Sequence, residues 1–364
     1  MWRKETFSPR FFSFAAGLVV AFLIAILTST ASPGLAIGVA DNNAFKTPDK
    51  RGEVAAKHLG FNLIRIFLWY HPDQTVLTPV QKQNLGLALA NLPRSSRLLV
   101  SVVGKPYETG NVWTSPKGIT TPAERGDYTR LLDDMTRTFP AIKDVSIWNE
   151  PNYPLFWSDR QDAAERYAAL LAASYDTLHP KGVRVYGFEL HPWRQPVDWV
   201  LRVGAWMRAT HRHRPLFDYV ATHPYPHTNS EVPWTRHRQP GVIGMGDVQR
   251  LRGLLRKAFS RTAQKRYPIA YTETGWTTAG LAPYAVTPRV QATRMVQALQ
   301  LAYCQRDVHA FVSFLLWDSS DYWQTGLIFP DRTTHKPAYA AYKAAVARVH
   351  ARRVRCSMFP RGVL

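Results

Sequence analysis

The chain has 364 residues, 46% of them hydrophobic and 12% aromatic, so it carries enough apolar material for one large core. Its formal net charge is +20, and its two cysteines, Cys304 and Cys356, are too few for a cysteine zinc cluster or a disulfide scaffold. A positive surface attracts polyanions such as acidic polysaccharides, lipid headgroups and nucleic acid, although a solvated arginine-rich surface explains the charge equally well.

The amino-terminal segment predicts export. Basic residues within the first ten positions precede an uncharged run over 11–27, and small residues follow, which is typical of a secretory signal. The run is long for a signal and short for a spanning helix, so residues 1–31 are predicted to be an export signal or a retained signal-anchor. The protein is then secreted or anchored on the outer face of the cytoplasmic membrane. In such an oxidising compartment Cys304 and Cys356 either form a bridge or stay unpaired.

From Ala36 onward, short apolar segments alternate with longer helical patterns, which is typical of a mostly parallel sheet. Eight such units predict an α/β fold, a single (β/α)8 TIM barrel over residues 36–350, followed by a basic tail over 351–364. An open doubly wound sheet is the alternative, but it seldom has eight regular units, and no G-x-G-x-x-G follows the first strand. The expected strands are 36–40, 62–68, 97–103, 144–148, 183–188, 217–221, 269–272 and 310–316, and the expected helices lie near 50–59, 79–92, 122–139, 161–178, 196–211, 246–263, 288–305 and 336–349.

Two glutamates stand where barrel enzymes carry their catalytic groups, just past the carboxyl ends of strands. Glu150 follows the fourth expected strand, in the sequence WNEPN at 148–152, and Glu273 follows the seventh, in TETGW at 272–276. Glycoside hydrolysis needs two carboxyl groups that flank the scissile bond, one protonated and one ionised. We expect burial and the neighbouring negative charge to raise the pKa of the acid. One such glutamate is often structural, but two at these positions favour a catalytic pair.

The sequences at 148–152 and 272–276 resemble the acid/base and nucleophile strands of clan A glycoside hydrolases, which include cellulases, β-mannanases, β-xylosidases and α-L-iduronidases. The resemblance covers nearly the whole chain from Ala36. Asn-Glu-Pro-Asn followed by Phe-Trp is most similar to the β-xylosidase and α-L-iduronidase branch and related bacterial exopolysaccharide hydrolases. It implies a retaining O-glycosidase with Glu150 as general acid/base and Glu273 as nucleophile, and no cofactor is expected.

The clan pattern also implies five residues that bind the substrate or support the nucleophile. Asn149 resembles the asparagine that binds the sugar 2-hydroxyl, and Arg65 resembles the arginine that keeps the nucleophile ionised. Tyr225 resembles the tyrosine that hydrogen-bonds the nucleophile, and His223 resembles its neighbour in the cleft. Trp317 resembles the tryptophan that forms the floor under the sugar. A surface ion pair remains an alternative for Arg65, as does ordinary core packing for Trp317.

Other residues near the expected cleft have less defined roles. Glu189 and His191 follow the fifth expected strand and are candidate subsite residues. No metal site is expected, because the intervening prolines forbid the helix that would align His223 with His227. Thr222 replaces a second histidine that relatives often carry, which leaves the substrate open. The candidate aromatic subsite residues, each with core packing as its alternative, are Trp69, Trp157, Trp193, Trp276 and Trp323.

The sequence therefore predicts a retaining glycoside hydrolase that acts by double displacement on an oligosaccharide or polysaccharide. The net charge suits an acidic polysaccharide, and the apolar amino-terminal segment suits membrane anchoring. A catalytically idle glycan-binding barrel and a transglycosylase are the alternatives. No nucleic-acid partner is expected, because an export signal works against it and no nucleic-acid-binding motif occurs.

Overall fold

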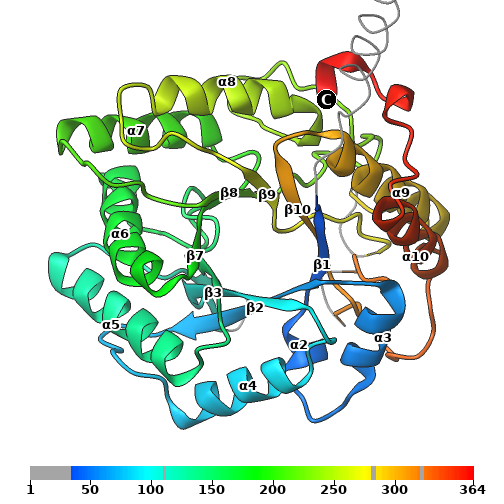
Figure 1. Ribbon diagram of the computed structural model, residues 1–364, viewed down its shortest axis with the longest axis horizontal. Coiled ribbons are helices and arrows are strands. Elements are labelled where there is room, and N and C mark those ends of the chain that lie inside the picture. Colours follow the sequence, from blue (N-terminus) through cyan, green and yellow to red (C-terminus); the bar gives the residue numbers. More distant parts are fainter. Residues whose placement is uncertain (1–33, 110–111, 280–283, 320–323) are drawn as a thin grey trace, which may run out of the picture.

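The structure is a computed structural model that describes residues 34–109, 112–279, 284–319 and 324–364 (Figure 1). Eight parallel strands close into one barrel with helices around its outside, which confirms the predicted (β/α)8 fold. The barrel strands are β1 (Ala36–Ala40), β2 (Leu63–Tyr70), β3 (Arg97–Gly104), β6 (Asp144–Ile147), β7 (Arg184–Leu190), β8 (Tyr219–Thr222), β9 (Ile269–Tyr271) and β10 (Val308–Phe314). The α-helices are α2 (Asn42–Phe45), α3 (Arg51–Leu59), α4 (Pro79–Ala90), α5 (Pro122–Thr138), α6 (Ala163–Leu178), α7 (Pro196–Ala209), α8 (Val248–Ala258), α9 (Pro288–Cys304) and α10 (Pro337–His350).

Strands that follow one another around the barrel are hydrogen-bonded neighbours, in the order β1-β10-β9-β8-β7-β6-β3-β2. The barrel closes where β1 pairs with β10 on one side and with β2 on the other. Gly38 of β1 lies opposite Leu63 of β2. A Cβ atom at Gly38 would lie 1.7 Å from the Leu63 carbonyl oxygen, so only glycine fits this close approach.

The buried apolar residues form two clusters. The larger cluster packs the helices onto the outside of the barrel, and a smaller one fills the barrel interior. Small side chains such as Ala36, Ala221, Ala270 and Ala310 make up much of the interior cluster, which explains how the barrel is filled without a pore. The interior is therefore solid below the carboxyl ends of the strands, and polar side chains collect above it.

Threonine caps followed by proline begin several helices. The Thr78 hydroxyl accepts from the Gln81 backbone at the start of α4, and Thr121 caps α5 through Glu124 in the same way. In both helices the third residue also bonds back to the cap, and proline occupies the first turn, where no donor is lost. Thr287 caps α9 without this second bond. These local signals set the helix starts close to the predicted positions.

Short elements outside the barrel pattern complete the fold. A hairpin of β4 (Tyr107–Thr109) and β5 (Val112–Thr114) follows β3, and single 3-10 turns are η1 (His179–Lys181), η2 (Met245–Asp247), η3 (Cys356–Met358) and η4 (Arg361–Val363).

The carboxyl-terminal segment is tied to the barrel. Cys304, at the end of α9, forms a disulfide with Cys356, with their Cα atoms 5.4 Å apart. The sequence left open whether these cysteines are bridged or unpaired, and in the structure they are bridged. Val363 is buried, and its carbonyl accepts a 2.7 Å hydrogen bond from the Gln305 side chain. The Leu364 carbonyl also accepts from Arg252 of α8 at 2.9 Å, so the basic tail packs against α8 and α9 rather than extending from the domain.

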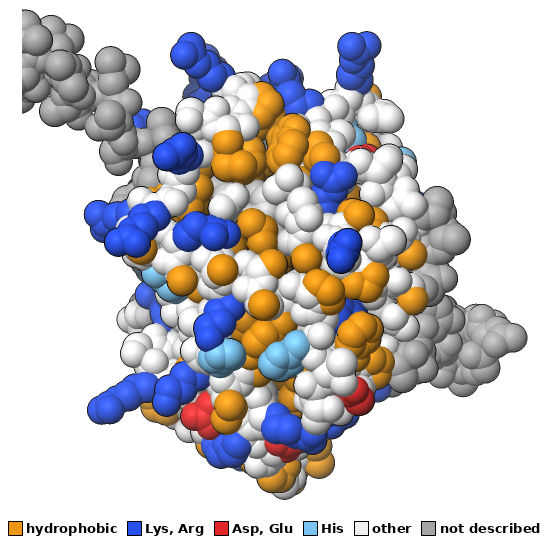
Figure 2. Space-filling view, turned by 90° about the vertical axis from the view of Figure 1, so that its right-hand side faces the viewer, with side chains coloured by type: hydrophobic (Ala, Val, Ile, Leu, Met, Phe, Trp, Pro, Cys, Tyr) orange, Lys and Arg blue, Asp and Glu red, His pale blue; other side chains and the backbone are white. Residues whose placement is uncertain are grey.

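The surface carries the excess of positive charge. Figure 2 shows Lys and Arg side chains spread over one face, with few acidic side chains among them. The predicted export signal or signal-anchor at 1–31 lies outside the described residues. Within the described ranges, every helix is too short or too polar to cross a membrane.

Candidate active site

Five charged side chains converge at the carboxyl ends of the barrel strands. Arg65 lies on β2 and Glu189 on β7, while Glu150, His223 and Glu273 lie within three residues of the ends of β6, β8 and β9. Arg65, Glu189 and His223 are fully buried, while Glu150 and Glu273 each keep 6% exposure. The barrel thus brings together acids that lie far apart in the chain.

Glu273 is held by two donors, one on each carboxylate oxygen. Arg65 Nη1 forms an ion pair with Glu273 Oε1, and the Tyr225 hydroxyl donates to Oε2 at 2.9 Å. Burial and the nearby Glu273 charge raise the pKa of Tyr225 well above its usual range, so the phenol keeps its proton and remains a donor. A guanidinium and a phenol that each donate to a different oxygen fix the orientation of the Glu273 carboxylate.

Glu150 is set at a strained backbone position. Its φ is +41°, a left-handed conformation that is uncommon for a non-glycine residue, and its backbone N–H donates to the Glu189 carbonyl at 3.1 Å. Its Oε1 lies 2.9 Å from His223 Nδ1. Burial favours a raised pKa, but the nearby His191 and the hydrogen-bonded His223 lower the pKa of Glu150 below its usual value. The expectation of a raised pKa at this acid is therefore wrong, because a cationic imidazole lies against it.

His223 stands between the three carboxylates. Its Nδ1 is 2.9 Å from Glu150 Oε1 and 3.8 Å from Glu273 Oε2, and its Nε2 bonds to Glu189 Oε2. Burial opposes the charge, but Glu273 and Glu189, with hydrogen bonds to Glu150 and Glu189, raise the pKa of His223 to about 10. The imidazole is consequently protonated at neutral pH, and both ring nitrogens donate.

Glu189 is an internal partner rather than a subsite residue. Its Oε2 accepts from Thr272 Oγ1 at 2.7 Å and from Arg65 Nη2 at 3.0 Å, and its Oε1 accepts from the Ser146 hydroxyl. Burial would raise its pKa, but Arg65 and His223 lower the pKa of Glu189 to about 2. A fully buried carboxylate with these partners does not contact a ligand in a cleft, which corrects its predicted place in a subsite.

The sequence did not predict the three hydroxyl groups that form hydrogen bonds with the buried Glu189 and Arg65 side chains. Ser146 and Thr272 bind Glu189, and Ser101 Oγ accepts from Arg65 Nε at 2.9 Å. Each is a hydroxyl residue within an otherwise apolar strand run or at its end. That pattern was the available signal, because a hydroxyl on a buried strand needs a partner.

Asn149 and Trp317 also lie near the centre. The Asn149 side-chain oxygen accepts from Arg65 Nη2 at 3.0 Å. Trp317 is 3% exposed, the Arg332 guanidinium lies 5.0 Å from its ring, and its backbone N–H donates to Asp41 at 3.1 Å. The tryptophan predicted as a floor is thus fixed in place and largely covered.

The other tryptophans divide into two groups. Trp157 and Trp276 are buried, so of their two predicted roles they have core packing and are not open sugar platforms. Trp69 and Trp193 keep part of their surface exposed. Trp323 lies outside the described residues. In the described part of the chain, no group of three histidine, cysteine or acidic residues is arranged to hold a metal ion.

No protein-family model and no curated protein matches this chain at the sequence level. Solved structures match it in fold. A family 39 glycoside hydrolase from Bacteroides cellulosilyticus WH2 has a TM-score of 0.61 and 17% identity over 86% of this chain, which spans 64% of that structure. The exo-β-1,4-mannosidase Op5Man5 from Opitutaceae bacterium strain TAV5 has a TM-score of 0.60 and 14% identity, with 90% and 62% of the two chains covered.

A family 128 endo-β-1,3-glucanase from Amycolatopsis mediterranei, solved with laminarihexaose, has a TM-score of 0.53 and 15% identity, covering 85% of this chain and 99% of that one. Likeness at this level of identity establishes the fold. The chain therefore has a (β/α)8 barrel like those of these three glycoside hydrolase structures.

Proposed function

We propose that this protein is a retaining glycoside hydrolase that acts by double displacement. The observation that carries the proposal is that Glu150 and Glu273 both face His223 Nδ1, at 2.9 and 3.8 Å. Two oxygens cannot be farther apart than the sum of their distances to one nitrogen. These distances limit Glu150 Oε1 and Glu273 Oε2 to a separation of at most about 6.7 Å. Retaining enzymes hold their carboxyl groups about 5–5.5 Å apart and inverting enzymes roughly 6.5–9.5 Å apart, so the limit excludes nearly all of the inverting range and favours retention.

In the first step, the Glu273 carboxylate attacks the anomeric carbon and the bond to the leaving oxygen breaks. Arg65 and Tyr225 hold one Glu273 oxygen each and so keep the carboxylate oriented for this attack. Glu150 donates a proton to the leaving oxygen. In the second step Glu150 removes a proton from water, whose oxygen bonds to the anomeric carbon and releases Glu273.

The Glu150–His223 pair supplies the proton. The low pKa of Glu150 and the raised pKa of His223 place this proton on the imidazole, 2.9 Å from the Glu150 oxygen. Transfer from Nδ1 to Glu150 accompanies transfer from Glu150 to the leaving oxygen, and the second step returns the proton to the pair. Glu189, ionised on the far side of the ring, keeps the imidazole aligned.

Replacement of Glu273 by Gln tests the proposal. We expect Glu273→Gln to abolish hydrolysis across a panel of aryl glycosides and bacterial envelope polysaccharides, with thermal unfolding showing a retained fold. Glu53→Gln, a carboxylate on α3, is the matched control and should keep full activity. Products analysed by ¹H NMR should first appear with the anomeric configuration of the substrate. Full activity of Glu273→Gln, or inverted products, would refute the assignment.

We also propose that the protein is exported and works on the outer face of the membrane or beyond it. The bridge between Cys304 and Cys356 supports this location, because disulfides persist in oxidising compartments. Mass measurement of the native protein under non-reducing conditions should find the bridge and show whether residues 1–31 are cleaved. A full-length chain with both thiols free in the cytoplasm would contradict the proposal.

A further inference from the structure

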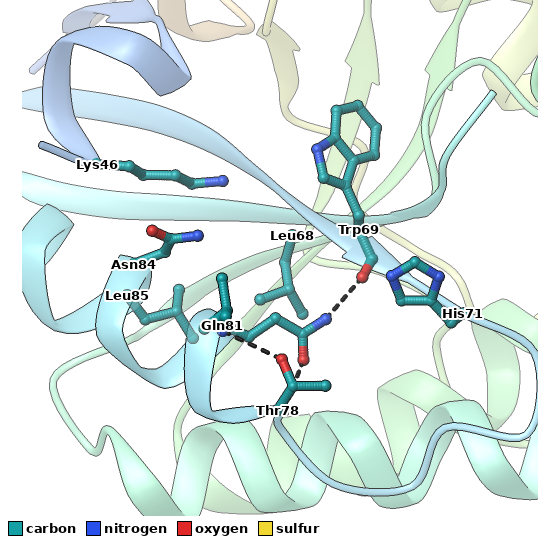
Figure 3. A pocket seen from close by; sticks show the side chains of 9 residues that line it. Lys46, Leu68, Trp69, His71, Thr78, Gln81, Asn84 and Leu85 are labelled. Carbon is teal, nitrogen blue, oxygen red and sulfur yellow. Dashed lines mark hydrogen bonds between the residues drawn. The ribbon is translucent and has the colours of Figure 1, made fainter. Parts of the chain in front are cut away.

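A pocket of about 210 Å³ opens at the carboxyl end of β2, between the residue after α2 and helix α4 (Figure 3). Trp69 and Leu68 line it from the strand, Lys46 from the segment after α2, and Asn84 and Leu85 from α4. The volume is below the roughly 300–1,000 Å³ of pockets for drug-sized ligands. It suits a single small unit such as one sugar ring.

Side chains in contact along β2 lead from the candidate active site toward the edge of this pocket. Arg65, which pairs with Glu273, has its guanidinium 4.5 Å from the Phe67 ring. The Phe67 ring in turn stacks on Trp69, with centroids 5.3 Å apart and planes inclined by 1°. Residues two apart on a strand share a face, so Arg65, Phe67 and Trp69 form one row along β2, and the backbone of Trp69 at the end of this row borders the pocket.

Lys46 places a positive charge in the pocket without a negative partner. Its ammonium donates to the Phe67 carbonyl and, among the described residues, forms no ion pair with a carboxylate. Burial lowers the pKa of Lys46 to about 8, as expected for a cation that lacks a counter-charge. In Figure 3 the Asn84 amide extends from α4 toward the same space below the Lys46 side chain.

The floor of the pocket is fixed by hydrogen bonds. The Gln81 side chain donates to the Trp69 carbonyl at 2.7 Å and accepts from the Thr78 backbone at 2.9 Å (Figure 3). The capping box of α4 therefore also holds the backbone that carries Trp69. A pocket held in this way needs little ordering when a ligand binds, which favours affinity.

We infer that this pocket is a subsite for a sugar unit that carries a carboxylate, in which Lys46 pairs with the carboxylate, Asn84 binds ring hydroxyls and Leu68 and Leu85 contact the apolar face of the ring. A single lysine matches the single charge of a carboxylate, whereas a phosphate group brings about −1.5 to −2. The placement of this subsite along a substrate rests on the proposed hydrolase function, but its binding preference does not.

The test compares acidic sugars with their neutral counterparts. Oligogalacturonate and oligomannuronate, each beside its carboxyl-reduced form, are titrated by calorimetry into the full chain and into Glu273→Gln, which limits hydrolysis. We expect at least one acidic oligosaccharide to bind about tenfold more tightly than its reduced form, since a half-buried ion pair outweighs an exposed one. Lys46→Gln should abolish this preference, while Lys46→Arg should keep it.

Two further variants make the result specific. Lys82→Gln removes an exposed charge from the same helix α4 and should leave the preference unchanged. Asn84→Ala should weaken binding of the acidic and the reduced forms by a similar factor, because its contacts do not depend on charge. Thermal unfolding of each variant identifies any loss of fold.

The possible outcomes distinguish failure of the subsite proposal from failure of the proposed hydrolase function. Lack of any preference for the acidic forms, or a preference that survives in Lys46→Gln, would overturn the subsite even if neutral glycans are hydrolysed. A Lys46-dependent preference in a protein that hydrolyses none of the glycans tested would support the subsite and reject the proposed hydrolase.

Discussion

Replacement of His223 by Asn tests how the candidate centre holds the proton that glycoside cleavage requires. In the wild-type protein the imidazole next to Glu150 has a pKa of about 10, so the pair keeps its proton into the alkaline range. Without the imidazole, the proton must reside on Glu150 itself. Burial and neighbouring charge tune catalytic glutamates to about 6–7. Because this is the upper range for glutamates and His191 still favours the ionised form of Glu150, the alkaline limb of the kcat/KM profile should move down by at least about 3 pH units.

The assay is a pH profile of kcat/KM on whichever aryl glycoside the wild-type protein cleaves. A substrate with a dinitrophenolate leaving group serves as a control, because departure of that group needs little help from an acid. We expect the shift in His223→Asn with the ordinary leaving group and a much smaller one with the activated group. An alkaline limb that stays at its wild-type position for the ordinary substrate would show that His223 does not share the proton of Glu150.

Stability gives a second measurement on the same variant. The pKa of His223 is raised from 6.5 to about 10, so its stabilising charge is fully present below about pH 6.5 and is lost as the pH rises toward 10. The free energy of unfolding in urea should fall over this window in the wild-type protein and fall less in His223→Asn. Equal slopes for the two proteins would contradict the protonated state of the imidazole.

Three substitutions test other contacts of the structure. Arg65→Gln leaves the buried carboxylates of Glu189 and Glu273 without their cation and should cost about 3–5 kcal/mol of unfolding free energy, measured in urea. Asp144→Ala removes a buried carboxylate bound by two arginines at the base of the barrel and should cost roughly 1–3 kcal/mol in the same experiment, while catalysis stays normal. Cys304→Ser opens the disulfide to the carboxyl-terminal segment and should cost about 2–4 kcal/mol, seen as a lower Tm. An unfolding free energy within about 0.5 kcal/mol of the wild-type value, typical of neutral surface substitutions, would contradict the respective contact.

The barrel could be predicted because its local signals agree with its global pattern. The strand Ala36–Ala40 has the predicted bounds, and most other strands begin or end within two residues of expectation. The hairpin after β3 and the four-residue helix Asn42–Phe45 were not predicted, because elements of three or four residues show no hydrophobic period.

The centre was only partly predictable. Glu150 and Glu273 were found because each lies in a distinctive motif after an apolar run. The environment of Glu189 depends on side chains from several strands that meet only when the barrel closes, so the sequence did not show that it is buried against Arg65 and His223. Lys46 was missed for the same reason, since its hydrogen-bond partner lies on the next strand.

The balance of charge at the candidate active site has a consequence for inhibitors of the proposed hydrolase. Three carboxylates, Glu150, Glu189 and Glu273, enclose two cations, Arg65 and the imidazolium of His223, so one negative charge is left uncompensated in a nearly dry space. If the proposed hydrolysis takes place here, a sugar ring that becomes an oxocarbenium ion meets this field already in place and needs no rearrangement of the protein. A basic iminosugar should feel the same attraction and bind more tightly than a neutral sugar of equal shape.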